Sequence, residues 1–295
     1  MLSQKSSLFN IFDDLYKFDE LLNIEEDLDV TFPITKEMLW TVFCVLYTLI
    51  EFIYLIMYIY DETTREIFTT LISYVTLLTH DLEHVLICSL LRAIFMRVRI
   101  LRAHVEKALG DGKQTNTNLD RVEALSKKAQ LDLNSLHKAY ELLHKSAEQL
   151  NSVMSLPMMI MLLSSGLSSI MLLKGLFRVL QTAVVQQEAE KVIVLYSVTR
   201  CIKYTFLVIV PCYYSSTTNT QVSQIRILLH DAMNSDNIGK LERRRIKAFF
   251  QLTRESEFAY ALFGVIRLNM SLPLSYLSLC TTYLVIIIQF SKFID

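Results

Sequence analysis

The feature that most constrains this chain is a set of five apolar stretches, each long enough to cross a lipid bilayer as a helix. A membrane-spanning helix needs about 20 mostly apolar residues. Charged side chains make up 20% of the 295 residues but are almost absent from these stretches. We therefore predict an all-α fold: a polytopic membrane helical bundle of five transmembrane helices with long cytosolic helix extensions. The five stretches are 38–60, 67–95, 153–173, 192–214 and 270–290.

The composition excludes several classes of protein. An apolar content of 52% is too high for a disordered chain. The chain has only six glycines and lacks the glycine motifs of dinucleotide-binding folds and P-loops. Because these motifs are absent, we expect no cofactor. The net charge of −1 lacks the positive excess of nucleic-acid-binding proteins, so we expect no nucleic-acid partner. The cysteines lie far apart within apolar stretches, as is typical of free buried thiols: Cys44, Cys88, Cys201, Cys212 and Cys280.

The charges of the connecting segments predict the orientation in the membrane. Segment 92–150 carries eleven Lys and Arg residues and segment 211–267 carries eight, whereas the connector 181–190 has none. Cytoplasmic loops of membrane proteins are enriched in Lys and Arg. Both long segments are therefore expected in the cytosol. With five spans, the N-terminus is then cytosolic and the C-terminus extracellular.

This topology divides the chain into six segments. The first is an amphipathic cytosolic segment, in which apolar residues from Leu8 to Leu22 recur at helical spacing. Two spans follow it, then a cytosolic helical linker, then the third and fourth spans. A second cytosolic loop contains a basic amphipathic helix, and the last span ends in a short extracellular tail. The segments are 1–36, 37–98, 99–152, 153–214, 215–267 and 268–295.

The two cytosolic segments carry helical patterns of their own. In the first, apolar residues from Ala129 to Leu150 alternate in steps of four and three, which is a heptad seam that runs unbroken into the third span. We favour packing of this seam within the chain over a self-associating coiled coil. In the second, Arg243, Arg244 and Arg245 precede an apolar face, and we expect this helix to lie at the lipid headgroups.

Ionisable side chains within the spans form the first candidate site. Arg200 and Lys203 cost about 5–7 kcal/mol at the centre of a bilayer, and the apolar residues of the same span return about 3–7 kcal/mol. The two cations therefore need acceptors on neighbouring helices, where Glu51, Asp81 and Glu83 are available. We predict that these groups converge on one polar cavity among spans one, two and four. A set of structural ion pairs that binds no ligand remains the alternative.

The histidines at 80 and 84 support two interpretations. They lie four residues apart on one helix face, as in the zinc motif H-E-x-x-H of metalloproteases. Here Asp81 replaces the general-base Glu, and the remaining histidines lie in the predicted cytosolic segments, so no third ligand is evident. Histidines that line the cavity are therefore favoured over a metal site. Because no other catalytic set is found, we expect that the protein is not an enzyme.

The last span carries an amide, Gln289, near its outer end. At helical spacing, Thr282, Ile286, Gln289 and Phe290 share one face. Repeated around an oligomer axis, this face would form a ring of amides beside rings of apolar side chains, which can pass hydrated ions and close by dewetting. Ordinary helix packing is the simpler explanation of the pattern taken alone.

The same stretch resembles a motif of the insect gustatory receptor family, whose members are seven-transmembrane chemosensory receptor channels related to insect odorant receptors. The run from Ile246 to Gly264 is similar to the re-entrant or amphipathic helix that precedes the last span in this family, and the junction 142–159 is also similar. The motif consists of Thr-Tyr, five hydrophobic residues and Gln-Phe. Here it reads Thr282-Tyr283, then Leu284 to Ile288, then Gln289-Phe290.

The resemblance implies a gustatory receptor, that is, a subunit of a ligand-gated, non-selective cation channel for taste detection. Such a receptor would be a homo- or hetero-tetramer with other gustatory receptors in the lipid of the plasma membrane, and its ligand would be a small-molecule tastant. The last helix would line the pore, with Gln289 and Phe290 at the gate. Thr282, Tyr283 and Ile286 would belong to the same pore helix. The ligand cavity of the family is compatible with the charged cluster and the two histidines found above, so the cavity candidates in this chain are Glu51, His80, Asp81, Glu83, His84, Arg200 and Lys203.

The family has seven spans, so the resemblance also implies that this chain lacks the first two. An alternative function follows from that difference: a truncated, non-conducting member that co-assembles with full-length receptors and modulates them. An intramembrane metalloprotease is a distant third hypothesis, because it depends on the two histidines alone.

Overall fold

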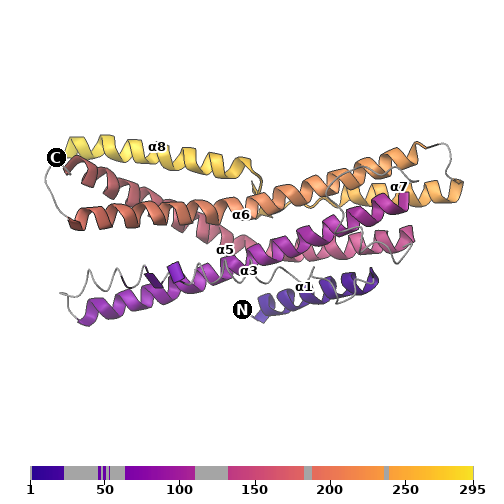
Figure 1. Ribbon diagram of the computed structural model, residues 1–295, viewed down its shortest axis with the longest axis horizontal. Helices are drawn as coiled ribbons and strands as arrows, with labels where there is room; N and C mark the ends of the chain where they lie inside the picture. The colour runs from indigo at the N-terminus through magenta and orange to yellow at the C-terminus, as the bar shows by residue number, and fades with distance from the viewer. Residues whose placement is uncertain are drawn as a thin grey trace. The chain divides into compact units, whose positions relative to one another are not determined.

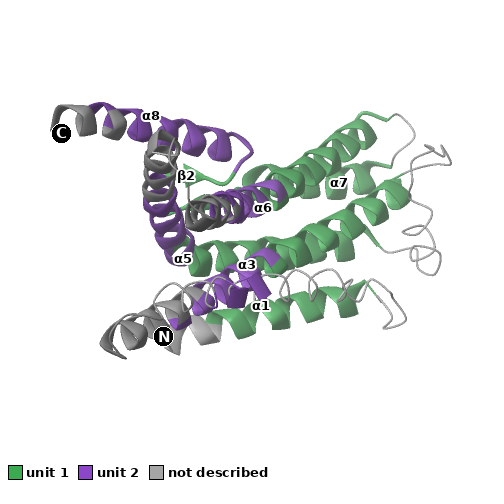
Figure 2. Cartoon of the chain, turned by 60° about the vertical axis from the view of Figure 1, so that its left-hand side comes forward, with its two compact units in different colours: residues 1–33, 89–155, 214–268 green, residues 34–88, 156–213, 269–295 purple. Residues whose placement is uncertain are grey.

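A computed structural model describes residues 2–22, 46–47, 49–50, 53, 64–109, 132–182, 188–235 and 239–294. The chain forms two compact units, which are distinguished by colour in Figure 2. Unit 1 comprises residues 1–33, 89–155 and 214–268, and unit 2 comprises residues 34–88, 156–213 and 269–295. The chain therefore passes repeatedly from one unit to the other.

The described elements are helices apart from one small hairpin (Figure 1). The all-α prediction is confirmed. Three of the predicted spans lie inside longer helices that also cover much of the predicted extensions: 67–95, 153–173 and 192–214. The last helix contains all of stretch 270–290 except its first residue, and it continues to residue 294. Stretch 38–60 lies largely outside the described residues. The elements are α1 (Leu2–Leu21), α3 (Thr64–Leu109), α5 (Leu133–Thr182), α6 (Glu188–Met233), α7 (Lys240–Glu255), β1 (Ala261–Leu262), β2 (Ile266–Arg267) and α8 (Ser271–Ile294).

Two prolines lie in the interior of helices. The apolar stretches 153–173 and 192–214 taken alone place Pro157 and Pro211 near helix ends, but both prolines lie inside α5 and α6. The reason is that both helices continue for several turns beyond the apolar stretches. Pro273 does lie in the first turn of α8, where the missing backbone N–H costs least.

The heptad seam of α5 forms the centre of unit 1. Its side chains Leu136, Tyr140, Leu143 and Leu150 are fully buried. The ring of Tyr140 meets Phe249 at 5.8 Å and Phe258 at 5.4 Å between centroids, both in edge-on geometry. Such pairs contribute about 0.5–1.5 kcal/mol beyond the buried area. The seam therefore packs within the chain, as predicted.

Helix α7 supplies the other side of this aromatic cluster. Its apolar face, which consists of Ile246, Phe249 and Thr253, is buried within unit 1. Our expectation that this face rests on lipid headgroups is wrong, because the protein core already covers it. The basic side chains Arg243, Arg244 and Arg245 remain exposed.

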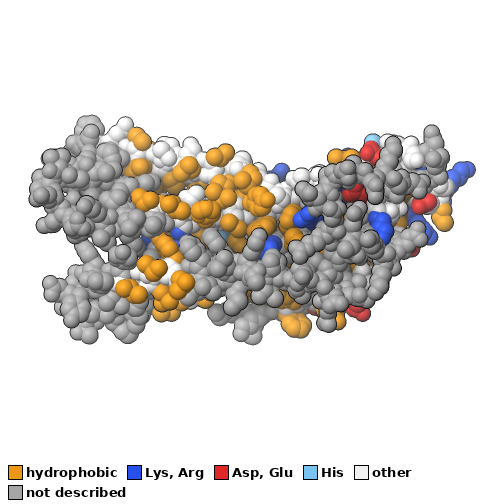
Figure 3. Space-filling view, viewed as in Figure 1, with side chains coloured by type: hydrophobic (Ala, Val, Ile, Leu, Met, Phe, Trp, Pro, Cys, Tyr) orange, Lys and Arg blue, Asp and Glu red, His pale blue; other side chains and the backbone are white. Residues whose placement is uncertain are grey.

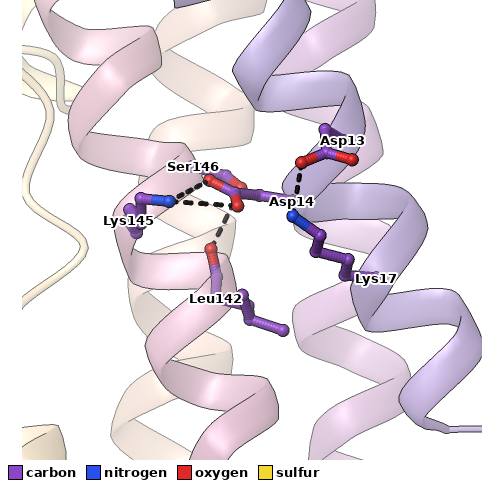
Figure 4. Close-up of polar contacts among 6 residues, drawn as sticks. All are labelled: Asp13, Asp14, Lys17, Leu142, Lys145 and Ser146. Atoms are coloured by element: carbon purple, nitrogen blue, oxygen red, sulfur yellow. Dashed lines mark hydrogen bonds and ion pairs between the residues drawn. The ribbon is translucent and has the colours of Figure 1, made fainter.

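Helix α1 is the amphipathic helix that we predicted near the N-terminus, and it belongs to unit 1. It buries Ile11, Leu15 and Phe18, which lie at helical spacing. Two ion pairs fix it. Asp14 accepts a hydrogen bond from Lys145 of α5, with Nζ–Oδ1 at 3.1 Å (Figure 4), and Asp19 accepts two hydrogen bonds from Arg97 of α3, at 2.9 and 2.5 Å. The bidentate geometry of the second pair also fixes its orientation.

Unit 2 differs from unit 1 in its surface. On α5, the side chains Leu156, Ile160, Leu163 and Leu167 follow one another at steps of four and three, and each is at least half exposed. Figure 3 shows apolar side chains gathered over the α6 and α8 segments of this unit. Among the described residues, the segment Leu133–Ile170 is long and apolar enough to cross a membrane, and α8 contributes a shorter apolar stretch, Ser271–Ile286.

Candidate functional site

The structure brings together one cation and one acid of the predicted charged cluster. Lys203 of α6 donates to Asp81 of α3, with Nζ–Oδ2 at 2.6 Å, and only 13% and 10% of these side chains are exposed. The ammonium group also lies 5.1 Å from the centroid of the Tyr47 ring. A cation over an aromatic face gains about 0.5–2 kcal/mol. The positive charge of Lys203 is therefore stabilised both by the Asp81 carboxylate and by the Tyr47 ring.

The other members of the predicted cluster are placed differently. Arg200 lies one turn from Lys203 and donates its Nε to the hydroxyl of Tyr204 at 3.1 Å, with the guanidinium over the same ring. Glu83 is exposed, and Glu51 lies outside the described residues. The predicted convergence therefore holds for the Asp81–Lys203 pair. The ion-pair alternative accounts for this part of the cluster without a ligand.

The two histidines occupy the face of α3 that also carries Asp81. His84 is buried, with its Nε2 at 3.4 Å from the Sγ of Cys88, and its Nδ1 has no hydrogen-bond partner among the residues that the structure describes. His80 is half-buried one turn away. Among the described residues, no group of three or more His, Cys, Asp or Glu side chains is placed to hold a metal ion. The metalloprotease hypothesis gains no support from this part of the chain.

The predicted pore face lies on α8, which is the last helix of unit 2. Thr282, Tyr283, Ile286 and Gln289 are all exposed, and the Thr282 hydroxyl donates to the carbonyl of Ser278 within its own helix. The side chain of Phe290 lies outside the described residues. Among the described residues, this face therefore does not pack against the rest of its own unit.

A contact between α8 and α5 was not predicted from the sequence. Tyr276 of α8 places its hydroxyl 2.7 Å from the Ser165 hydroxyl and donates to the carbonyl of Leu162 at 3.2 Å. A Cβ atom on Gly166 would lie 3.1 Å from the same hydroxyl. The Ser164-Ser165-Gly166 run inside an otherwise apolar span was the available signal, because small residues allow helices to approach closely in membranes.

Comparison with known proteins decides the family. Residues 1–294 match the family model described as 7tm chemosensory receptor. The chain belongs to this family. The resemblance inferred from the C-terminal motif is thereby confirmed as a relationship to chemosensory receptors.

A solved structure supports the fold of the receptor. The chain is similar to the insect olfactory receptor OR5 from Machilis hrabei, with a TM-score of 0.52 and 15% sequence identity. The match covers 98% of this chain and 68% of that chain. No curated protein matches the receptor. At such low identity the likeness shows the helical fold alone, and the family makes the receptor a multi-pass membrane protein and not an enzyme.

Proposed function

We propose that the receptor is a gustatory receptor: a subunit of a ligand-gated, non-selective cation channel that detects tastants at the plasma membrane. The observation that carries the proposal is the exposed face of α8, where Thr282, Ile286 and Gln289 lie within a motif typical of the gustatory branch. A polar amide on a membrane helix is costly when it faces lipid. A shared axis between copies supplies the water that the amide needs.

The proposal includes an assembly and an orientation. Four subunits, of this chain or of related gustatory receptors, place their α8 helices around the pore. Unit 1 faces the cytosol, because its segments hold the Lys and Arg clusters of the two long loops. The N-terminus is then cytosolic and the C-terminus extracellular.

The tastant site in this proposal lies at the charged cluster of unit 2. Asp81 and Lys203 neutralise one another, and His84 presents a buried ring nitrogen that no described residue hydrogen-bonds. A buried polar atom of this kind has an unmet hydrogen bond, which a ligand can complete. A small neutral molecule with a hydroxyl or a carbonyl group suits this chemistry, and both sugars and bitter compounds carry such groups.

The test is whole-cell recording from cells that express this chain alone, with a panel of sugars and bitter compounds. We expect a cation current that the variant Gln289→Ala alters in conductance or gating. The matched control is Leu277→Ala, an exposed apolar residue on the other side of α8, which should leave the current unchanged. An identical current in the Gln289→Ala receptor, at equal surface expression, removes the pore assignment.

A further inference from the structure

The hairpin β1–β2 of unit 1 has one buried face and one outer face. Its strands pair Ala261 with Arg267 and Leu262 with Ile266. Successive side chains of a strand point to opposite faces, so every second residue lies on the same side. The side chains of the inner face are buried in unit 1; they are Tyr260, Leu262 and Leu268. The residues between them belong to the outer face, which points away from this core.

The tip of the hairpin, which we define as Phe263, Gly264 and Val265, carries large apolar side chains away from the core. Phe263 is 61% exposed, and Val265, at 82%, is the most exposed large apolar side chain among the described residues. Arg267 is exposed on the same strand face as Val265, two residues further on. Apolar side chains that gather at a surface beside polar ones mark sites of contact with a partner or a membrane. The tip is therefore a candidate contact site with a cation beside it.

The backbone of the tip adopts a conformation that residues with side chains avoid. Phe263 and Gly264 both have positive φ, 51° and 72°. We had expected helix up to Gly264, but positive φ at two successive residues ends any right-handed helix and produces the hairpin. The N–H of Val265 donates to the carbonyl of Leu262 at 3.0 Å and closes the turn. Backbone strain of this kind is often found at sites that have a function.

Side chains of α5 and α6 fix the base of the hairpin. Asn151 of α5 accepts from the N–H of Ala261 at 3.0 Å, and the Ser215 hydroxyl of α6 donates to the carbonyl of Leu268 at 2.5 Å. The N–H of Leu268 in turn donates to the carbonyl of Tyr260 at 2.9 Å. All of these residues belong to unit 1. The hairpin is therefore attached to its own unit through its backbone, and the tip is free to contact something else.

Asn151 marks the level of the hairpin along α5. This helix buries Leu150 and Met154, whereas Leu156, five residues after Asn151, begins the exposed apolar stripe. Five residues of helix span about 7.5 Å along its axis. The headgroup region of a bilayer is about 5–7 Å thick on each side of the hydrocarbon core. If the stripe meets the hydrocarbon, the base of the hairpin therefore lies near the level of the headgroups.

We propose that the tip is a membrane anchor: Phe263 and Val265 insert among the lipid headgroups, and Arg267 pairs with the lipid phosphates. Aromatic side chains favour this region of a membrane, and a guanidinium group binds phosphate with two parallel hydrogen bonds. Lipid is the occupant because the base of the hairpin lies at the headgroup level of α5 and because Arg267 complements the phosphate charge. The anchor requires a membrane protein but no current, so it stands apart from the proposed channel.

Tryptophan fluorescence of the full chain in lipid nanodiscs tests the anchor. The chain has one tryptophan, Trp40, so the substitution Trp40→Phe gives a silent background. In this background Phe263→Trp should lose most of its emission to phosphatidylcholine brominated near the headgroup end of its acyl chains, and little to iodide in the buffer. Leu241→Trp, at a residue of α7 that is 66% exposed, is the matched control and should respond to iodide alone. Leu163→Trp, on the apolar stripe of α5, is the control for contact with lipid.

A second position keeps the test decisive if Phe263→Trp does not fold. Val265→Trp places the same probe at the other side of the tip and should show the same pattern. Quenching by iodide and not by brominated lipid at both positions overturns the anchor, because the tip then lies in water. Resistance to both quenchers also overturns it, because protein then covers the tip.

A change of charge tests the part assigned to Arg267. In the Phe263→Trp receptor, Arg267→Glu should weaken quenching by brominated lipid, because lipid phosphates repel a carboxylate. Arg267→Lys keeps the positive charge and should preserve the quenching. Equal quenching in Arg267→Glu and Arg267→Lys overturns the pairing with phosphate.

Discussion

Units 1 and 2 place apolar and polar side chains in opposite ways. In unit 1 the large apolar side chains of the α5 seam are buried, and charged residues such as Arg243 and Arg244 are exposed. In unit 2 the apolar stripe of α5, which consists of Leu156, Ile160, Leu163 and Leu167, is exposed, whereas Asp81 is buried and the Lys203 side chain is only 13% exposed. The surface of unit 1, with charged side chains outside, suits contact with water, and the surface of unit 2, with apolar side chains outside, suits contact with lipid. A single continuous helix, α5, changes from one pattern to the other between Met154 and Leu156.

The two units are therefore stabilised by different interactions. Unit 1 is stabilised by the removal of apolar surface from water, and the buried rings of Tyr140, Phe249 and Phe258 are part of that surface. In lipid no such gain exists between helices, so unit 2 depends on close packing and on internal polar contacts. The contacts of Tyr276 with Ser165 and of Lys203 with Asp81 are of that kind.

The largest expected effect is the loss of a core ring in unit 1. The substitution Phe249→Ala should lower the free energy of unfolding by about 3–5 kcal/mol, because it empties a fully buried site. Thermal melting of the solubilised receptor measures it. The control Phe9→Ala removes a ring that is 74% exposed and should change stability by less than about 0.5 kcal/mol. Equal effects of the two substitutions would contradict the buried core of unit 1.

The next effect concerns the buried ion pair of unit 2. Lys203→Met should destabilise the receptor by about 3 kcal/mol, because it leaves the Asp81 carboxylate buried without its cation. The double variant Asp81→Leu/Lys203→Met should recover most of that loss. The measurement is a double-mutant cycle of melting temperatures. If the two single losses simply add in the double variant, the pair is not coupled.

A smaller effect is expected where α8 meets α5. Gly166→Ala should destabilise by about 1 kcal/mol, because the crowding of its Cβ against the Tyr276 hydroxyl exceeds the helix preference of Ala. In a Tyr276→Phe background that hydroxyl is absent, and the same change should become neutral or stabilising. A stabilising effect of Gly166→Ala in the unmodified receptor would show that the contact is looser than the structure indicates.

The smallest effect is a pH dependence in unit 1. Burial, and secondarily the charge of Lys107, lower the pKa of His104 below its usual 6.5. The unfolded chain therefore binds more protons below that pH, and stability should fall as the pH drops from 7 to 5. His104→Gln should flatten this fall in melting temperature, and His230→Gln, at an exposed position, should not. A slope that His104→Gln leaves unchanged would mean that the fall arises elsewhere.

Much of the fold follows from sequence periodicity, whereas the pairing of side chains does not. The apolar stretches and the seam from Leu133 to Leu150 indicated the helices, because burial imposes a regular spacing. The apolar stretches wrongly placed helix ends near Pro157 and Pro211. Helices α5 and α6 continue from one unit into the other, so they do not end where the apolar stretch gives way to polar sequence.

The candidate site was predicted in part. The free-energy cost of placing Lys203 in a membrane indicated that it needs an acidic partner. The sequence offers several such acids, and only the packing of the helices selects Asp81. Tyr276 and Ser165 were missed because hydroxyls and a glycine leave no periodic signal. The hairpin was missed because a Phe at positive φ is rare and Phe263 alone gives no sign of it.

In the proposed channel, the exposed face of α8 lines a water-filled pore shared between subunits. Substituting cysteine at Gln289 and applying a charged, membrane-impermeant thiol reagent from outside during recording tests whether this face meets water. We expect current through Gln289→Cys receptors to change irreversibly, while current through the parent and through Leu163→Cys, on the exposed apolar stripe of α5, does not change. Gln289→Cys receptors that reach the surface, conduct, and ignore the reagent would contradict it.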